Sequence, residues 1–117
     1  MRVDVAQLQQ FTESIFLAAG LSPVHAGLVA DSLVMSDLRG THSHGIVRVP
    51  FLIDRLVKGG ANADPQIKVV REAPATALLD GDRALGAVTA THAMRMAMKK
   101  AHTAVIMFVA GNNSVII

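Results

Sequence analysis

Glycine and proline residues divide the first sixty positions of this chain into short segments, and this punctuation constrains the fold more than any other feature. Apolar residues recur at three- and four-residue spacings over residues 5–19, which predicts a helix that ends at Gly20. Ser22 before Pro23 is typical of a helix N-terminus, and this second helix is expected to end before Gly40. Since each helix has one apolar face, we expect the two to pack together as a hairpin.

The third segment combines a polar loop with a helix. Residues 39–45, Arg-Gly-Thr-His-Ser-His-Gly, form a polar stretch bounded by glycines. A helix is predicted over about residues 50–58, where it is closed by two glycines. Because Pro50 disfavours helical geometry at the residue before it, we expect the helix to start close to this proline. His44 then lies at or before the N-terminus of the third helix.

After residue 65 the pattern changes to short β-prone runs. The predicted elements are strands at residues 67–71 and 76–79, a helix at about 87–102 and a buried strand at 104–110. The predicted fold class is therefore α+β, with about four helices and a small mixed sheet. We expect residues 1–60 to form a helical segment with the polar loop, and residues 61–117 to hold the strands plus a helix, as the start of a sheet domain that is truncated.

The composition requires a core of small and aliphatic side chains. Apolar residues make up 51% of the chain, but it has only four Phe, no Trp and no Tyr. The predicted apolar faces are Val5, Leu8, Phe11, Ile15 and Ala19 on the first helix, Ala26, Val29, Ala30 and Leu33 on the second, and Ala90, Met94, Ala97 and Ala101 on the last. This apolar content excludes intrinsic disorder.

Composition also excludes several classes of function. The absence of cysteine excludes disulfides, thiolate catalysis and Cys-ligated zinc. The net charge of +2 comes without a basic block, so we expect no nucleic acid and no membrane as partners. The most apolar stretch, residues 104–110, is far shorter than the roughly 20 residues that span a bilayer, and the N-terminus does not resemble a signal peptide. The absence of cysteine is consistent with a cytoplasmic protein, which is what we expect. We also expect a homo-oligomer, because charge is low and residues 115–117 are apolar.

The one dense polar cluster lies in residues 37–48, which contain two histidines, a serine and two arginines framed by glycines. Loops of this kind often position functional side chains. Histidine exchanges protons near neutral pH, and arginine binds carboxylates through two parallel hydrogen bonds. His44 and Arg48 would therefore suit a small anionic substrate whose carbonyl or hydroxyl exchanges a proton with the imidazole.

Two other interpretations of this cluster stay open on residue types alone. It could be a solvated loop in which Ser43 caps the third helix and Arg48 pairs with Asp37 or Asp54. The spacing His-x-His at residues 42–44 could begin a metal site, but no cluster of Asp, Glu or Cys offers further ligands at suitable spacing, so we expect no metal.

Residues 36–48, Ser-Asp-Leu-Arg-Gly-Thr-His-Ser-His-Gly-Ile-Val-Arg, resemble the signature of the malate/L-lactate dehydrogenase family. That family also includes ureidoglycolate dehydrogenase, diketogulonate reductase and the cyclic-imine carboxylate reductases. The resemblance extends across essentially the whole chain, through Leu-Val-Lys-Gly at residues 56–59 and Leu-Asp-Gly at residues 79–81. It implies an oxidoreductase that transfers a hydride between NAD(H) or NADP(H) and a small 2-hydroxy or 2-keto acid, or a carboxylated imine.

The resemblance also implies roles for individual residues. His44 would donate and accept the proton at the substrate oxygen or nitrogen, and Arg48 would hold the substrate carboxylate, with Ser43 near it. Asp37 and Arg39 would brace the loop. The cofactor, NAD or NADP, would bind in a region that this chain lacks, so no cofactor-binding residue is assigned here.

The chain departs from the family pattern in three ways. The family's Asn-Ser-x-His turn has Ile116 in place of histidine here, and a family glycine is replaced by Val105. Relatives are well over twice as long. We therefore expect an N-terminal portion of such an enzyme that is inactive alone; the alternative is a stand-alone helical binding or interaction module without catalysis.

Overall fold

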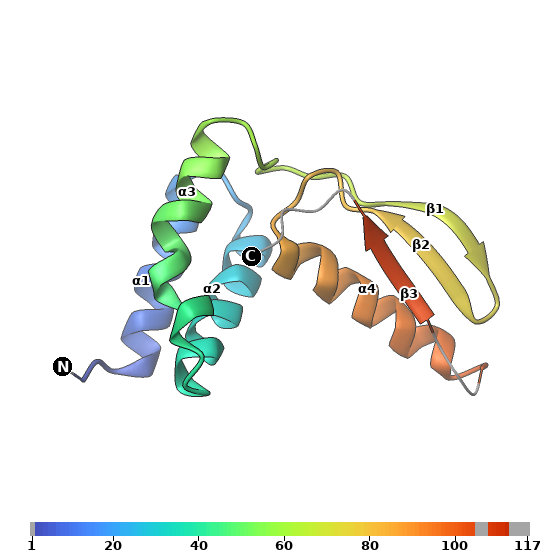
Figure 1. Cartoon of the computed structure of the whole chain (residues 1–117), viewed down its shortest axis with the longest axis horizontal. Coiled ribbons are helices and arrows are strands. Elements are labelled where there is room, and N and C mark those ends of the chain that lie inside the picture. The colour runs from blue at the N-terminus through green and yellow to red at the C-terminus, as the bar shows by residue number, and fades with distance from the viewer. Residues whose placement is uncertain (1, 105–107, 113–117) are drawn as a thin grey trace.

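The computed structural model describes residues 2–104 and 108–112, and it confirms an α+β fold (Figure 1). In these residues the helices are α1 (Val5–Ala18), α2 (Pro23–Leu38), α3 (Val49–Val57) and α4 (Gly86–Ala101), and the strands are β1 (Lys68–Ala73), β2 (Thr76–Asp80) and β3 (Phe108–Asn112). Helices α1 to α3 lie together at one side of the molecule, here called the helical part. The sheet and α4 lie at the other side, here called the sheet part.

The first two helices begin and end at the predicted signals. Asp4 and Ser22 cap α1 and α2, since their side chains accept hydrogen bonds from backbone N–H groups three residues later. Gly20 follows α1 with a φ of +104°, and the Leu21 N–H bonds the Phe16 carbonyl. This Schellman closure needs the left-handed conformation that glycine adopts readily. The two helices pack against each other, which confirms the predicted hairpin.

The hydrophobic core confirms one predicted helix face and corrects another. On α2 the predicted face is fully buried: Ala26, Val29, Ala30 and Leu33. On α1 the buried residues are Thr12 and Phe16, whereas Phe11 of the predicted face is 64% exposed. The helix is therefore rotated relative to the prediction, because Phe16 fits among α2 and α3 and the Thr12 hydroxyl can be buried by donating to the Leu8 carbonyl.

One core cluster crosses from the helical part to the sheet part. Phe16, Leu33 and Leu52 lie in the same cluster as Leu85 and Val88 at the start of α4. Turn residues reinforce this junction by hydrogen bonding. The Asp82 carboxylate accepts from the Asn62 side chain and from the Gln66 backbone, and the Arg83 side chain donates to the Gly59 carbonyl.

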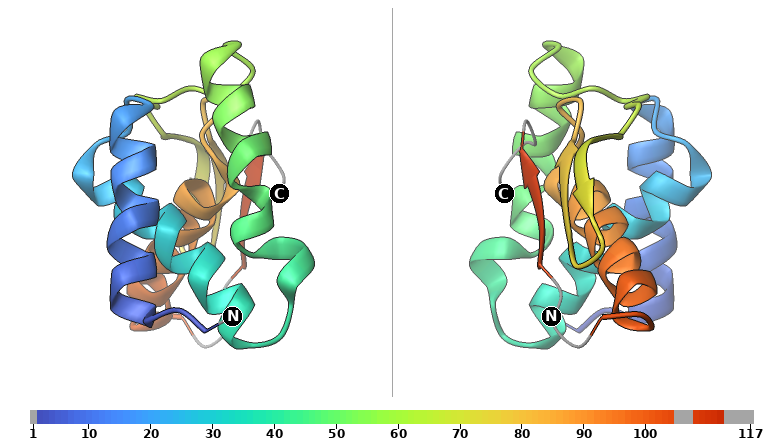
Figure 2. Two further views of the ribbon diagram at one scale, coloured as in Figure 1. Left: turned by 90° about the vertical axis from the view of Figure 1, so that its left-hand side faces the viewer. Right: turned by 90° about the vertical axis from the view of Figure 1, so that its right-hand side faces the viewer.

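The three strands form a mixed sheet in the order β1-β2-β3 (Figure 2). β1 and β2 lie close to the two predicted strands and form an antiparallel hairpin around residues 74 and 75. β2 and β3 are parallel, and α4 is the crossover between them. The last strand was predicted at residues 104–110 but is found at Phe108–Asn112. Val105 and Ile116, where the chain departs from the family pattern, lie outside the described residues.

The buried face of α4 also differs from the prediction. Val88 and Thr89 are buried, while Ala90, Met94 and Ala101 of the predicted face are exposed. Alanine and methionine occur on all sides of this helix, so its pattern alone does not select a face, and packing against α2 decides which residues are covered. Within the described part of the chain, no helix has both the length and the apolar character needed to cross a membrane.

Candidate functional site

The polar cluster predicted from the sequence lies where α2 ends and α3 begins. Gly40 leaves α2 with a φ of +81°, and the Thr41 N–H bonds the Ser36 carbonyl, which closes the helix. The chain then forms two 3-10 turns, His42–His44 and Ile46–Arg48, before α3 begins. His44 is thus in the first turn, five residues before α3, and the side chains of residues 42–44 are exposed.

Asp37 braces this loop from the last turn of α2. One carboxylate oxygen lies 2.8 Å from His42 Nδ1, and the other accepts a 2.8 Å hydrogen bond from the Ile46 N–H. The hydrogen bond from Ile46, followed by that of His42, lowers the pKa of Asp37; burial opposes this shift, and the charge of His42 adds to it. A Cβ atom at position 45 would overlap the Asp37 carboxylate, so this close approach requires Gly45.

Ser43 contacts both residues to which the sequence assigned chemistry. Its Oγ lies 2.9 Å from His44 Nδ1, and its carbonyl accepts a 2.9 Å hydrogen bond from Arg48 Nε. Among the described residues, His44 Nε2 and the terminal amino groups of Arg48 make no hydrogen bond. The loop therefore presents an imidazole nitrogen and a guanidinium edge that can both bind a ligand.

The structure rules out the contacts expected for a purely structural loop. Residue 48 occupies the N-cap of α3 and no side chain caps this helix, so Ser43 does not. Arg48 pairs with neither of the predicted aspartates, because Asp37 bonds His42 and Ile46 while Asp54 pairs with Lys58. Of the two residues expected to brace the loop, Asp37 does so, whereas Arg39 is exposed and its side chain bonds no described residue.

One feature of the site was missed from the sequence. The Arg48 guanidinium lies 5.9 Å from the centre of the Phe51 ring, and Arg55 lies 5.6 Å from the same ring. Both distances are within cation–π range. The three-residue spacing from Arg48 to Phe51 was the available signal, since such residues are neighbours on a helix surface. In the described residues, no group of three His, Asp or Glu side chains could hold a metal ion.

Known proteins with similar sequences are dehydrogenases. A malate dehydrogenase of Pyrococcus horikoshii is 41% identical over 97% of this chain, and a ureidoglycolate dehydrogenase (NAD(+)) of Escherichia coli is 41% identical over 86%. The chain spans only about a third of the length of these relatives, 32% of the first and 29% of the second.

Solved structures of dehydrogenases resemble this chain over about the same third of their own length. The malate dehydrogenase structure from Pyrococcus horikoshii superimposes with a TM-score of 0.95 over 97% of this chain and 33% of its own. The sulfolactate dehydrogenase structure from Methanocaldococcus jannaschii has a TM-score of 0.94 at 38% identity. The sequence profile of malate/L-lactate dehydrogenases matches residues 3–116. This chain therefore belongs to the malate/L-lactate dehydrogenase family.

Proposed function

We propose that this chain supplies the substrate side of the active site of an oxidoreductase. The complete enzyme would transfer a hydride between NAD(H) or NADP(H) and a small 2-hydroxy or 2-keto acid, or a carboxylated imine. The observation that carries the proposal is the double contact of Ser43, which holds the imidazole of His44 by its hydroxyl and the guanidinium of Arg48 by its carbonyl. Because the chain spans about a third of its relatives, we expect it to be inactive alone.

Arg48 is the proposed carboxylate-binding residue. Its Nε is occupied by the Ser43 carbonyl and its guanidinium lies near the Phe51 ring, so its orientation is restricted before a ligand arrives. The terminal amino groups remain available to a carboxylate. An arginine that is oriented in advance loses less entropy on binding than a freely rotating one.

His44 is the proposed proton donor and acceptor. When its Nδ1–H donates to the Ser43 hydroxyl, the lone pair of Nε2 can accept the proton of a substrate hydroxyl as the alcohol is oxidised. In the reverse direction the Nε2–H of the imidazolium donates to the carbonyl oxygen. The nicotinamide cofactor would supply or remove the hydride, and we assign no described residue to holding it.

The names of the relatives support a carboxylate-containing substrate. Malate, ureidoglycolate and sulfolactate each contain a carboxylate next to a carbon that bears a hydroxyl. A guanidinium for the carboxylate and an imidazole for the hydroxyl match this arrangement.

Titration of the 117-residue chain with L-malate, followed by NMR, tests the substrate-side assignment. We expect saturable shifts of residues 42–48, and we expect Arg48→Met to weaken binding about tenfold or more, since it removes a charged hydrogen-bonding partner. Arg55→Met is the matched control, because it removes the same charge from the other residue near the Phe51 ring. Equal weakening by the two variants, or shifts confined to other residues, would contradict the assignment.

A further inference from the structure

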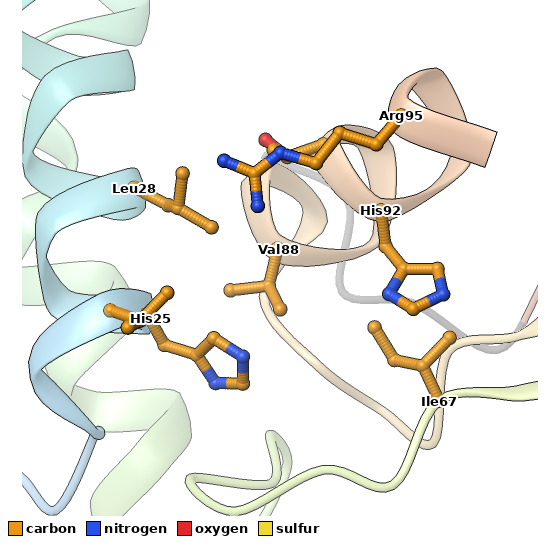
Figure 3. Close-up of a pocket in the computed structure, with 8 residues that line it drawn as sticks. His25, Leu28, Ile67, Val88, His92 and Arg95 are labelled. Atoms are coloured by element: carbon orange, nitrogen blue, oxygen red, sulfur yellow. The ribbon is translucent and has the colours of Figure 1, made fainter. Parts of the chain in front are cut away.

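A second concentration of chemically active side chains lies between α2 and α4, away from the His44 loop (Figure 3). A pocket of about 70 Å³ opens there, and its apolar lining is Val24, Leu28, Ile67 and Val88. His25 comes from the first turn of α2, whereas His92 and Arg95 come from consecutive turns of α4. In the close-up these three polar side chains surround Val88.

Apart from Thr91, whose hydroxyl donates to the Ala87 carbonyl, the polar side chains that line this pocket are His25, His92 and Arg95, and each of these three offers N–H donors. No lining residue is acidic. The Arg95 guanidinium and the imidazoles of His25 and His92 make no hydrogen bond or ion pair with any residue in the described ranges. Arginine has five N–H donors and no acceptor, and an imidazole keeps at least one N–H donor in either protonation state. The pocket therefore favours a ligand that accepts hydrogen bonds and has negative charge.

The same geometry disfavours a metal ion. Two histidines are fewer than the three or four protein ligands of a typical site, and no third His, Asp or Glu joins them among residues 2–104. The positive charge of Arg95 would also repel a cation. A volume of about 70 Å³ suits a single compact group rather than an extended ligand.

We infer that this pocket binds a small oxyanion, either free phosphate or the phosphate group of a monoester. Arg95 forms two parallel hydrogen bonds to the oxyanion, and His25 and His92 donate to its other oxygens. Because the donors come from two helices, the bound anion links the helical part to the sheet part. An occupant that binds only the folded chain also stabilises the fold.

Titration of the 117-residue chain with inorganic phosphate tests this inference. Calorimetry measures binding, and the unfolding midpoint measures stabilisation. Phosphate replaces chloride so that the ionic strength stays constant. We expect saturable binding that Arg95→Met weakens about tenfold or more and His25→Gln about threefold. Arg71→Met, on the exposed strand β1, is the charge-matched control and should bind as the parent does. Phosphate also stabilises proteins by exclusion from their surface, but that effect acts equally on all variants.

A parallel titration with glycerol 3-phosphate distinguishes the two sources of the phosphate group. Tighter binding of the monoester identifies a phosphorylated metabolite as the ligand, and tighter binding of inorganic phosphate identifies the free ion. Circular dichroism in chloride verifies that each variant is folded. The inference is overturned if neither compound binds saturably, or if Arg95→Met and Arg71→Met weaken binding equally.

Discussion

The helical part and the edge strand of the sheet part, β1, differ in how completely they bury their side chains. Phe16, Leu33 and Leu52 of the helical part are fully buried, whereas all six residues of β1 are exposed. The hydrogen bonds that shape the His44 loop lie within residues 36–48, entirely in the helical part. The comparison indicates that the helical part holds the proposed chemistry and most of the core cluster, which continues into the start of α4, while the edge strand β1 contributes little to either.

The strongest test that the proposed chemistry lies in the helical part is a measurement of catalysis. In a chimera that joins residues 3–112 of this chain to the remaining two thirds of the Pyrococcus horikoshii enzyme, His44→Asn should lower kcat by about 10²–10⁴, because general acid–base catalysis contributes a factor of this size. The matched change His102→Asn, at the exposed end of α4, should leave kcat unchanged. The measurement is oxidation of NADH or NADPH with oxaloacetate. Equal activity of the two variants would move the proton donor elsewhere.

The difference in packing predicts unequal effects on stability. Leu33→Ala should lower the free energy of unfolding by about 2–5 kcal/mol, since it leaves a cavity at a fully buried position. Val70→Ala in β1, where the side chain is 59% exposed, should change it by less than about 0.5 kcal/mol. Urea unfolding of both variants measures the two effects. Similar losses would mean that β1 is packed in solution.

Alanine substitutions at two glycines of the helical part should change the stability of the chain in opposite directions. Gly45→Ala places a Cβ on the Asp37 carboxylate and should cost about 1–3 kcal/mol as the loop shifts. Gly27→Ala, within α2, meets only an ordinary contact of 3.7 Å with Glu13 Oε1 and should stabilise the chain by about 0.5–1 kcal/mol. Thermal unfolding compares them. A stable Gly45→Ala variant with an unshifted loop in its NMR spectrum would show that Asp37 does not brace the loop as described.

The smallest expected effect is the pH dependence contributed by Asp37. Its pKa is lowered on folding, chiefly by the Ile46 N–H, so its ionised form stabilises the folded state. This contribution is fully present above its ordinary pKa of 3.8 and is lost as the pH falls through the lowered value. The stability difference between the parent and Asp37→Asn should therefore shrink below that pH. A difference independent of pH would exclude a role for the charge.

Local rules predicted the beginnings and ends of the helices well. Ser22 with Pro23 starts α2, and Gly20 and Gly40 end α1 and α2, because caps and left-handed closures depend on residues within one or two turns. The loop from residue 39 to 45 was predicted for the same reason. The brace between Asp37 and the Ile46 N–H could not be predicted in detail, because it joins residues nine positions apart through a fold of the loop.

The sequence by itself determined the α+β class, the helix ends, and a cluster of His44, Ser43 and Arg48 that marks a family. Only the tertiary structure decided which faces of α1 and α4 are buried, which partner Arg48 takes, and that His25, His92 and Arg95 meet at one pocket. Backbone conformation depends mainly on neighbouring residues, whereas burial and side-chain pairing depend on what another element brings alongside. On a helix with small apolar residues on several sides, only packing selects the buried face.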